Sequence, residues 1–270
     1  MFRSLFKSRT PPAAVPMANG LPEGVVVWAI GDIHGRLDLL KTLLGTVVPD
    51  LEESNASRRC IVFLGDYIDR GPDSKGVIDH LCRLEDQQAF ECHFLRGNHE
   101  DRMEAFLIDP EVGPGWCDYG GREALRSYGV TPPLMREDTE SWATASRELA
   151  IAMPARHREF LARQESSFTI SPYFFAHAGA RPGVRLDEQD ANDLMWLRQP
   201  FLDHPAPFDQ VVVHGHTPTE AVHSDHRRIG IDTGAYATGM LTGLRLQGLN
   251  REIAQTHQVG RALRVDRMAL

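Results

Sequence analysis

Asp32 and His34 lie two residues apart in "GDIHG", directly after the apolar run "VVVWAI". A carboxylate and an imidazole held side by side can ligate a metal ion. Glycine, aspartate and histidine also suit the corner between a strand and a helix, where the pair would only hydrogen-bond the turn. The two residues alone leave both readings open, and the rest of the chain decides between them.

Similar oxygen- and nitrogen-bearing side chains follow the other apolar runs of the chain. They are Asp66, Asn98, His99, His177, His214 and His216. Carboxylate, amide and imidazole donors without a thiolate suit borderline divalent ions such as Mn²⁺, Fe²⁺ or Zn²⁺. A single histidine at a strand end is normally structural, but donors that recur at five strand ends predict a metal site.

The first part of the chain alternates strand-like and helix-like segments. Residues 24–32, 60–66 and 91–98 are rich in β-branched and aromatic residues and end on glycine with Asp or Asn, as buried strands do. Residues 36–48 and 74–87 have the apolar spacing of helices that lie on a sheet. This βαβαβ order predicts parallel strands. Ligands of such sheets bind beyond the carboxyl ends of the strands, where the polar residues fall.

The rest of the chain has a different pattern. Loops marked by proline and glycine, with helical stretches between them, predict a helical insertion at about 100–168. Strand-like runs follow at 171–179, 210–217, 227–234 and 240–247. The last three lie close together and predict a second sheet, mostly antiparallel.

The blocks "GDIHG", "GDYIDRG" and "RGNHE", followed by "HAG" and "GHTP", resemble the signatures of the calcineurin-like metallophosphoesterases, specifically of the phosphoprotein phosphatase family. The match runs in order over residues 25–240 and is most similar to the bacterial and bacteriophage branch, which includes diadenosine tetraphosphate hydrolases. It implies an α/β fold, a β-sandwich of two mixed sheets flanked by helices. We expect a flexible leader at 1–22, one catalytic domain at 23–250 and a C-terminal tail at 251–270.

The resemblance also implies a pair of divalent metal ions. By position it assigns Asp32 and His34 to one ion, Asn98, His177 and His216 to the other, and Asp66 to both. Two ions bring four positive charges against two carboxylates, so the pocket stays positive and attracts a phosphate dianion. A hydroxide that bridges the ions would attack phosphorus in line, because metal binding lowers the pKa of water to about 7. Mn²⁺ is the expected metal, with Fe or Zn as alternatives.

Catalytic side chains follow from the same resemblance. His99 corresponds to the general acid that protonates the leaving oxygen, and Asp69 to the carboxylate that hydrogen-bonds this histidine and raises its pKa. Arg70, Arg96 and Arg198 correspond to arginines whose guanidinium forks bind phosphate oxygens. For Arg70 and Arg96 the alternative is a surface salt bridge.

Some residues near these motifs have no assigned role. His214 precedes the expected ligand His216 by two residues, and a supporting or structural role is the preferred reading. The insertion has "WCDYGGREAL" where bacterial members often have "NGG" after a tryptophan, so Trp116, Tyr119 and Arg122 either shape the substrate entrance or pack the insertion. Asp232 in "IDTGA" also fits the family, but we expect it only to seat the second sheet.

Composition restricts the class of protein. The chain has 270 residues, 42% hydrophobic and 24% charged, which is typical of a globular protein. Its formal net charge of −8 argues against a general nucleic-acid or anionic-membrane binder. No apolar stretch reaches the length of a membrane span. The cysteines show no CxxC spacing, so buried free thiols are the simplest account of Cys60, Cys82, Cys92 and Cys117. A cytoplasmic location is expected.

Three functions are compatible with these residues. The preferred one is hydrolysis of phosphoserine or phosphothreonine in proteins. The alternative is a hydrolase of diadenosine tetraphosphate or another small phosphoester, which would use the same metal core. A catalytically silent scaffold that recognises phosphorylated partners is the third, but the presence of His99 and of every expected ligand disfavours it. The sequence predicts neither the physiological substrate nor the oligomeric state.

Overall fold

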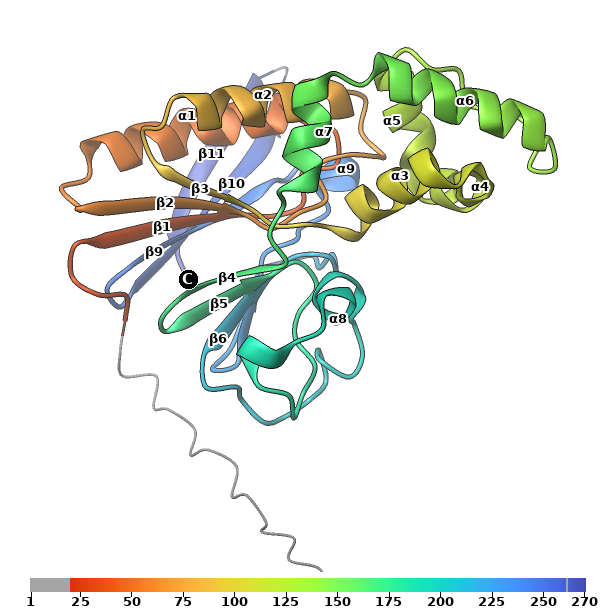
Figure 1. The fold of residues 1–270 in the computed structure, drawn as a ribbon. Coiled ribbons are helices and arrows are strands. Elements are labelled where there is room, and N and C mark those ends of the chain that lie inside the picture. Colours follow the sequence, from red (N-terminus) through yellow and green to blue (C-terminus); the bar gives the residue numbers. More distant parts are fainter. Residues whose placement is uncertain (1–19, 261) are drawn as a thin grey trace, which may run out of the picture.

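The computed structural model describes residues 20–260 and 262–270. Two β-sheets face each other, and helices cover their outer sides (Figure 1). The strand order is β11-β10-β9-β1-β2-β3 in the first sheet and β4-β5-β6-β8-β7 in the second. Both sheets are mixed, so the predicted α/β class, with two mixed sheets flanked by helices, is confirmed.

The predicted βαβαβ unit forms half of the first sheet. Its elements are β1 (Val25–Ile30), α1 (Leu37–Glu53), β2 (Arg58–Phe63), α2 (Ser74–Asp86) and β3 (Glu91–Phe94). β1 pairs in parallel with β2, and β2 with β3. Every residue of β1 is buried because both faces of this sheet are covered. The loops that leave the three strands therefore meet at one edge.

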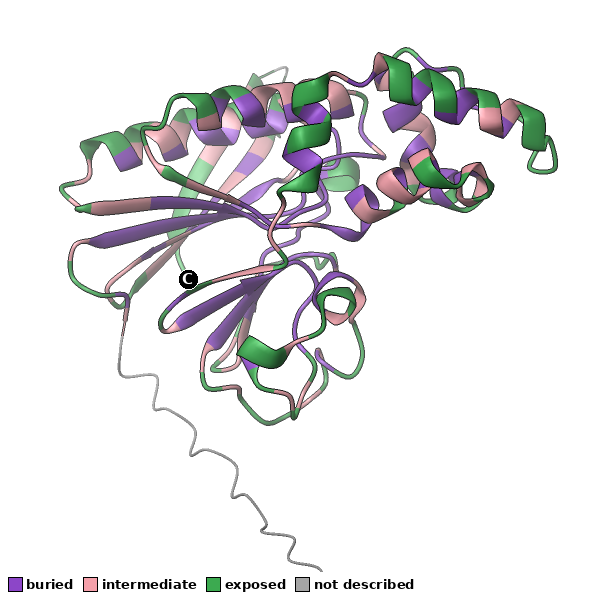
Figure 2. Ribbon diagram, in the orientation of Figure 1, coloured by how far each residue is buried: buried purple, intermediate pink, exposed green. Residues whose placement is uncertain are grey.

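β1 is buried along its whole length (Figure 2), and its alternate residues belong to two different cores. Trp28 and Ile30 point toward the helices and belong to the core that contains Leu43 of α1. Val27 and Ala29 point the other way and belong to the core between the two sheets. This alternation, inherent in a strand, fixes the position of β1 from both sides. The loop after it starts from a rigid support.

The other half of the first sheet corrects two expectations. β9 (Thr242–Gln247) pairs antiparallel with β1, so placing residues 240–247 in the second sheet is wrong. β10 (Asn250–Val259) and β11 (Ala262–Ala269) continue this sheet, so a C-terminal tail at 251–270 is wrong as well. The physical reason is that the hairpin of β10 and β11 pairs with the edge of β9 that β1 leaves free, so the backbone groups at that edge are hydrogen-bonded.

The expected leader falls mostly outside the described part of the chain, since residues 1–19 are not described. The last part of that segment belongs to the fold. Leu21 is buried, and its N–H donates to the carbonyl of Gly248. The structured domain therefore already includes Leu21.

The second sheet contains β4 (Ser167–Ile170), β5 (Tyr173–Ala176), β6 (Val211–His214), β7 (His223–Ser224) and β8 (Arg228–Gly230). Its central pairs, β5 with β6 and β6 with β8, are parallel, and only the outer pairs are antiparallel. The prediction of a mostly antiparallel sheet is therefore wrong. Parallel central strands send the loops after β5 and β6 to the same edge, as in the first sheet.

Helices occupy the segment between β3 and β4, where the sequence predicts an insertion. They are α3 (Asn98–Ile108), a 3₁₀ turn (Pro110–Val112), α4 (Gly113–Trp116), a π-helical turn (Cys117–Gly121), α5 (Arg122–Ser127), α6 (Thr139–Ala152) and α7 (Ala155–Ala162). The π turn ends in a kink at Gly120, whose φ of 111° suits only glycine. Beyond β5 the chain adds a 3₁₀ turn (Leu186–Glu188) and α8 (Ala191–Trp196), and α9 (Ala235–Thr238) follows β8.

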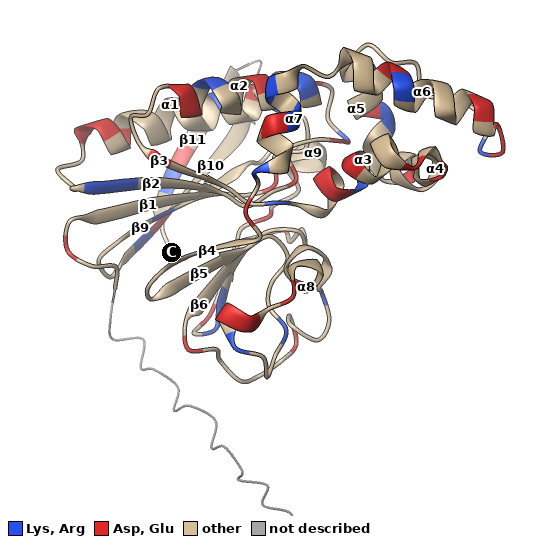
Figure 3. Ribbon diagram, in the orientation of Figure 1, with Lys and Arg blue, Asp and Glu red and all other residues tan. Residues whose placement is uncertain are grey.

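Acidic and basic side chains are interspersed over the helices (Figure 3). None of the helices within the described residues combines the length and the apolarity that a membrane span requires. All four cysteines are free thiols, as expected, but only Cys60, Cys82 and Cys117 are buried and Cys92 is partly exposed.

Candidate metal centre and active-site cleft

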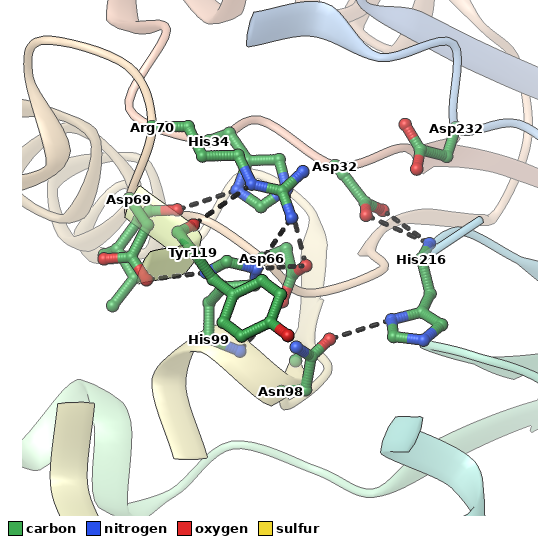
Figure 4. A network of polar contacts seen from close by, with 12 residues as sticks. Asp32, His34, Asp66, Asp69, Arg70, Asn98, His99, Tyr119, His216 and Asp232 are labelled. Carbon is green, nitrogen blue, oxygen red and sulfur yellow. Dashed lines mark hydrogen bonds and ion pairs between the residues drawn. The ribbon is translucent and has the colours of Figure 1, made fainter. Parts of the chain in front are cut away.

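Loops that follow five different strands bring the predicted polar residues together (Figure 4). The loop after β1 carries Asp32 and His34, the loop after β2 carries Asp66, Asp69 and Arg70, the start of α3 carries Asn98 and His99, and the loops after β5 and β6 carry His177 and His216. All of these side chains except that of Arg70 are buried. The edge predicted from strand order is thus the edge where they converge.

The backbone at this edge adopts conformations that side chains normally avoid. His34, Asp66, Asp69, Arg70 and His216 all have φ between 47° and 72°. Left-handed conformations of non-glycine residues cost about 1–3 kcal/mol each and persist where the surrounding structure imposes them. Five such residues at one edge cost stability, so we infer that they serve a functional site.

Two glycines allow carboxylates to approach the backbone closely. A Cβ at Gly97 would lie 2.2 Å from Oδ1 of Asp66, and one at Gly215 would lie 2.0 Å from Oδ1 of Asp32. The backbone N–H groups that follow use this space: His99 donates to Oδ1 of Asp66 at 3.1 Å, and His216 donates to Asp32 at 3.0 and 3.2 Å. Both carboxylates are therefore fixed by backbone donors.

One group of candidate metal ligands consists of His34, Asp66 and His99. The Nδ1–H of His34 donates to the carbonyl of Ile68 at 2.9 Å, so its Nε2 presents a free lone pair. That nitrogen lies 3.5 Å from Oδ2 of Asp66. Burial lowers the pKa of His34 to about 3, so the imidazole is neutral and able to ligate at pH 7.

The second group consists of Asp66, His177 and His216. The Nδ1–H of His177 donates to the carbonyl of Leu64 at 2.8 Å, which leaves Nε2 bare. This Nε2 lies 3.0 Å from Oδ1 of Asn98, 3.2 Å from Nδ1 of His216 and 3.4 Å from Oδ1 of Asp66. Burial lowers the pKa of both imidazoles, that of His216 to about 2.

These contacts place acceptor atoms against one another. The bare nitrogen of His177 faces an amide oxygen and a carboxylate oxygen, neither of which carries a proton for it. A shared cation removes this conflict, and imidazole with carboxylate and amide oxygen is a donor set for borderline divalent metals. Asp66 belongs to both groups, so its two oxygens face two adjacent positions. The residues present therefore fit two cations.

Asp32 lies beside these groups rather than inside them. The sequence pairs it with His34 as a ligand, but the structure turns its carboxylate to the N–H of His216 and places it beside Asp232. Burial raises the pKa of both carboxyls, and each is raised further by other buried carboxylates. In the sequence analysis, Asp232 is not placed in the site, but its carboxylate contributes to the charge of the site. The motif "IDTGA" is the sequence signal that indicates this residue.

His99 is held by the carboxylate predicted to hold it. Its Nδ1 lies 2.6 Å from Oδ2 of Asp69. Burial lowers the pKa of His99, but the charge of Asp66 and the hydrogen bond with Asp69 outweigh burial and leave the pKa above its usual value. The indole Nε1–H of Trp116 donates to the same Asp69 oxygen at 2.7 Å. Trp116 therefore supports Asp69 in addition to packing the insertion.

The insertion also holds Arg70. The backbone N–H of Arg70 donates to the carbonyl of Gly120 at 3.1 Å, and its Nε donates to the carbonyl of Tyr119 at 3.3 Å. Its guanidinium then reaches Nε2 of His99 at 3.3 Å and lies 4.5 Å from the ring centroid of Tyr236. The kink at Gly120 thus places the guanidinium of Arg70 next to His99 at the reacting edge, the sheet edge where the predicted polar residues converge.

Glu100 is a structural support that the sequence reading missed, although it is the last residue of "RGNHE". Its carboxylate accepts from the backbone N–H groups of Asp66, Tyr67, Ile68 and Gly97 at 2.9–3.3 Å. A buried carboxylate with four donors fixes the loop after β2 onto α3. The signal was its position within a block that otherwise supplies site residues.

A cleft of about 780 Å³ opens in front of these groups. Arg70 and Arg198 line it, and Arg198 donates to the carbonyl of His216 at 3.3 Å. Arg96 is not among the lining residues described, and it forms ion pairs with Asp101 and Glu104. The geometry therefore favours the surface ion pair for Arg96 over a phosphate contact.

The remaining open residues divide between the cleft and the framework. Tyr119 is 69% exposed and lines the cleft, in front of His99 in Figure 4. Arg122 donates to the carbonyl of Pro133 at 2.7 Å and packs the insertion. His214 donates to the carbonyl of Gly215 and accepts from Arg228, which is the structural role preferred from the sequence.

Two facing mixed sheets with an edge of buried imidazoles and carboxylates define a metal-dependent hydrolase of phosphoesters. A sequence model described as calcineurin-like phosphoesterase matches residues 25–246, and the chain belongs to that family. The resemblance read from the motifs is confirmed at this level. The family depends on two metal ions, which agrees with the two groups of donors.

Several proteins of known name are similar over most of the chain. The bis(5′-nucleosyl)-tetraphosphatase PrpE [asymmetrical] of Geobacillus thermodenitrificans is 27% identical over 234 residues, which cover 80% of this chain and 88% of that protein. The zinc-dependent endopolyphosphatase of Saccharomyces cerevisiae is 20% identical over 254 residues, covering 81% and 74%.

Solved structures share the fold. One, provisionally named a diadenosine tetraphosphatase, superposes with a TM-score of 0.56 at 19% identity, covering 94% of this chain and 96% of that chain. The cold-active protein-tyrosine phosphatase of a Shewanella species gives 0.54 at 18% identity, covering 91% and 80%. At these identities the likeness establishes the fold and no more.

Proposed function

We propose that this chain hydrolyses dinucleoside polyphosphates such as diadenosine tetraphosphate. The observation that carries this proposal is the similarity to bis(5′-nucleosyl)-tetraphosphatases from several bacteria, 24–27% identical over 80% of this chain. It favours the alternative of the sequence analysis over hydrolysis of phosphoproteins. A cleft of about 780 Å³ supports it, because this volume exceeds what a single phosphate needs.

The proposed metal site takes the two donor groups described above without His99, which is kept as the acid, and adds Asp32 and Asn98 as the sequence analysis predicts. Asp32, His34, Asp66, Asn98, His177 and His216 would hold two divalent ions, with Mn²⁺ as the expected metal and Zn²⁺ or Fe as alternatives. When bound, the ions supply Lewis-acid charge and lower the pKa of water at phosphorus. Asp66 and Asp32 balance part of that charge, and the neutral imidazoles add none.

The chain's own side chains would do the rest. Arg70 and Arg198 bind oxygens of the phosphoryl group under attack, because a guanidinium fork matches two of them. One water loses a proton to solvent and adds to phosphorus, the P–O bond of the anhydride breaks, and the leaving phosphate oxygen takes the proton from Nε2 of His99, which solvent then reprotonates. Asp69, on the other side of the ring, stabilises the protonated imidazole.

The test compares substrates on one preparation of Mn²⁺-loaded protein. Initial rates are measured with diadenosine tetraphosphate and with phosphoserine, phosphothreonine and phosphotyrosine peptides, and nucleotide products are separated by chromatography. We expect turnover of the dinucleotide to ATP and AMP, with a higher kcat/KM than for any peptide. Peptide turnover without dinucleotide turnover would refute the proposal and restore the phosphoprotein phosphatase reading. The metal-free protein is the blank.

A further inference from the structure

The cleft extends beyond the groups assigned to the metals and to the reacting phosphate. Its lining also includes Arg102 of α3 and Trp196, the last residue of α8. The same two elements also reach the reacting edge, because α3 begins with Asn98 and His99 and Arg198 follows α8. The same two helices, α3 and α8, therefore position Arg102 and Trp196 as well as the catalytic groups.

Arg102 lies one helical turn beyond the reacting edge. Residues three and four apart share one face of a helix, so His99, Asn98 and Arg102 project to the same side, and one turn advances about 5.4 Å. Arg102 is exposed to solvent and lines the cleft. A guanidinium in this position faces the part of a substrate that extends beyond the phosphoryl group under attack.

No carboxylate within residues 20–260 and 262–270 forms an ion pair with Arg102, although Glu111 and Glu137 also line the cleft. Other arginines nearby are paired: Arg96 with Asp101, and Arg136 with Asp118 at 2.7 Å. An unpaired guanidinium in a cleft is available to an anion.

Trp196 orients this guanidinium. The guanidinium carbon of Arg102 lies 4.7 Å from the centroid of the Trp196 ring, within the range of a cation–π contact. Stacking on an indole holds the planar fork in place without consuming its N–H donors. The fork therefore remains free to donate to phosphate oxygens.

We propose that Arg102, held by Trp196, forms a subsite for a phosphate group distal to the one under attack. The ligand class is an oligophosphate chain, free or as part of a nucleotide. This inference rests on the proposed function, since it explains how the cleft would favour a polyphosphate over a simple monoester. Arg102 binds the distal phosphate directly, and Trp196 is a positioning residue for Arg102.

The experiment separates long from short ligands. Wild type, Arg102→Ala, Trp196→Leu and Trp196→Phe are assayed with p-nitrophenyl phosphate, and inorganic tripolyphosphate is added as inhibitor. We expect Arg102→Ala to raise the inhibition constant of tripolyphosphate about tenfold and to leave kcat/KM for p-nitrophenyl phosphate unchanged. Trp196→Leu should act in the same direction but less, and Trp196→Phe should restore much of the loss. Arg147→Ala, an exposed arginine of α6, is the control.

Two results would overturn the subsite. One is tripolyphosphate inhibition that Arg102→Ala leaves unchanged. The other is an equal loss on p-nitrophenyl phosphate, which would place Arg102 at the reacting group. The KM of diadenosine tetraphosphate should rise in parallel with the inhibition constant. If wild type does not hydrolyse this dinucleotide but tripolyphosphate inhibition still depends on Arg102, the proposed function fails and the subsite stands.

Discussion

His99 is placed between two carboxylates on opposite sides of its ring. Its Nδ1 lies 2.6 Å from Oδ2 of Asp69, and its Nε2 lies 3.8 Å from Oδ2 of Asp66. Asp69 thereby fixes the tautomer and orientation of the ring, while Nε2 lies 3.3 Å from Nη2 of Arg70 and the residue lines the cleft. This is the arrangement that a proton donor to a leaving oxygen requires.

The substitution His99→Asn should lower kcat by about 10²- to 10⁴-fold, because a positioned general acid contributes that much. The loss should be larger for an alkyl phosphate than for p-nitrophenyl phosphate, since a weakly basic leaving group needs less protonation. Steady-state kinetics on both esters provides the measurement. Metal content should stay near that of wild type, and unchanged kcat on the alkyl ester would show that His99 is not the acid.

The substitution Asp66→Asn should weaken both metal sites, because Asp66 is the residue that the two ligand groups share. We expect fewer than two ions per chain after gel filtration, measured by elemental analysis. Asp118→Asn, a change at an exposed aspartate of the insertion, is the control and should bind metal as wild type does. Two tightly held ions in Asp66→Asn would contradict the bridging assignment.

At the scale of residues, the sequence predicts one contact between two motif blocks and misses contacts made by residues outside the five blocks. The contact of Asp69 with His99 follows from the blocks, and the structure places the two together. Trp116 and Asp232 meet their partners only through long-range folding, so their spacing carried no signal of those contacts. For Arg96 the sequence predicts a phosphate contact, but the structure favours ion pairs. Its position in a motif block does not determine the direction of its side chain.

At the scale of elements, the insertion is part of the site rather than an addition to it. The segment from Trp116 to Gly120 contacts both Asp69 and Arg70 on the loop after β2. Its tight turn needs glycine, since a Cβ at Gly120 would lie 2.5 Å from Cγ of Arg70. A change in the insertion should therefore affect the reaction without any contact with the metals.

The substitution Trp116→Phe tests this coupling, because it keeps a ring in the core but removes the Nε1–H that donates to Asp69. We expect kcat to fall about three- to tenfold, corresponding to one lost hydrogen bond of about 1 kcal/mol. Trp142→Phe is a matched control, since Trp142 is buried in the same insertion and its Nε1 donates to the carbonyl of Met135 instead. Equal losses of kcat in both variants would show that Trp116 only packs the insertion.

The elements that the sequence predicts well are those with strong local patterns. β1 is a continuous apolar run, β2 is apolar from Cys60 onward, and α1 and α2 each have a clear apolar face. β10 and β11 mix apolar residues with polar and charged ones in no regular alternation, and β11 is mostly exposed at the sheet edge. Their pairing with β9 and with each other, rather than hydrophobicity, makes them strands, and pairing is not visible in the local sequence.

At the scale of the whole molecule, Asp50 ties the C-terminal hairpin to the rest of the domain. Its carboxylate, near the end of α1, accepts hydrogen bonds from Trp28 of β1, Arg245 of β9 and Arg267 of β11. Burial raises the pKa of Asp50, but these hydrogen bonds, that of Arg245 foremost, outweigh burial and leave the pKa below its usual value. The ionised form therefore stabilises the fold.

Asp50→Asn should lower the free energy of unfolding at pH 7 by about 1–2 kcal/mol, or Tm by about 2–5 °C. Because folding depresses the pKa, the contribution is complete above pH 4 and is lost as pH falls through the folded pKa. The Tm difference between wild type and variant should therefore shrink below pH 4, as calorimetry would show. Asp187→Asn, at an exposed aspartate, should leave Tm unchanged at both pH values.

The arginines of the cleft belong to a molecule whose formal charge is −8. Far from the surface, a polyphosphate meets net repulsion, which would persist with two divalent ions bound. Screening decides which field the ligand senses: the Debye length is about 30 Å at 0.01 M salt but about 8 Å at 0.15 M. Moderate salt screens the distant acidic charges but leaves most of the short-range attraction by the arginines of the cleft. Capture of substrate should thus be fastest at intermediate ionic strength, slowed by repulsion in dilute buffer and by loss of attraction in concentrated salt.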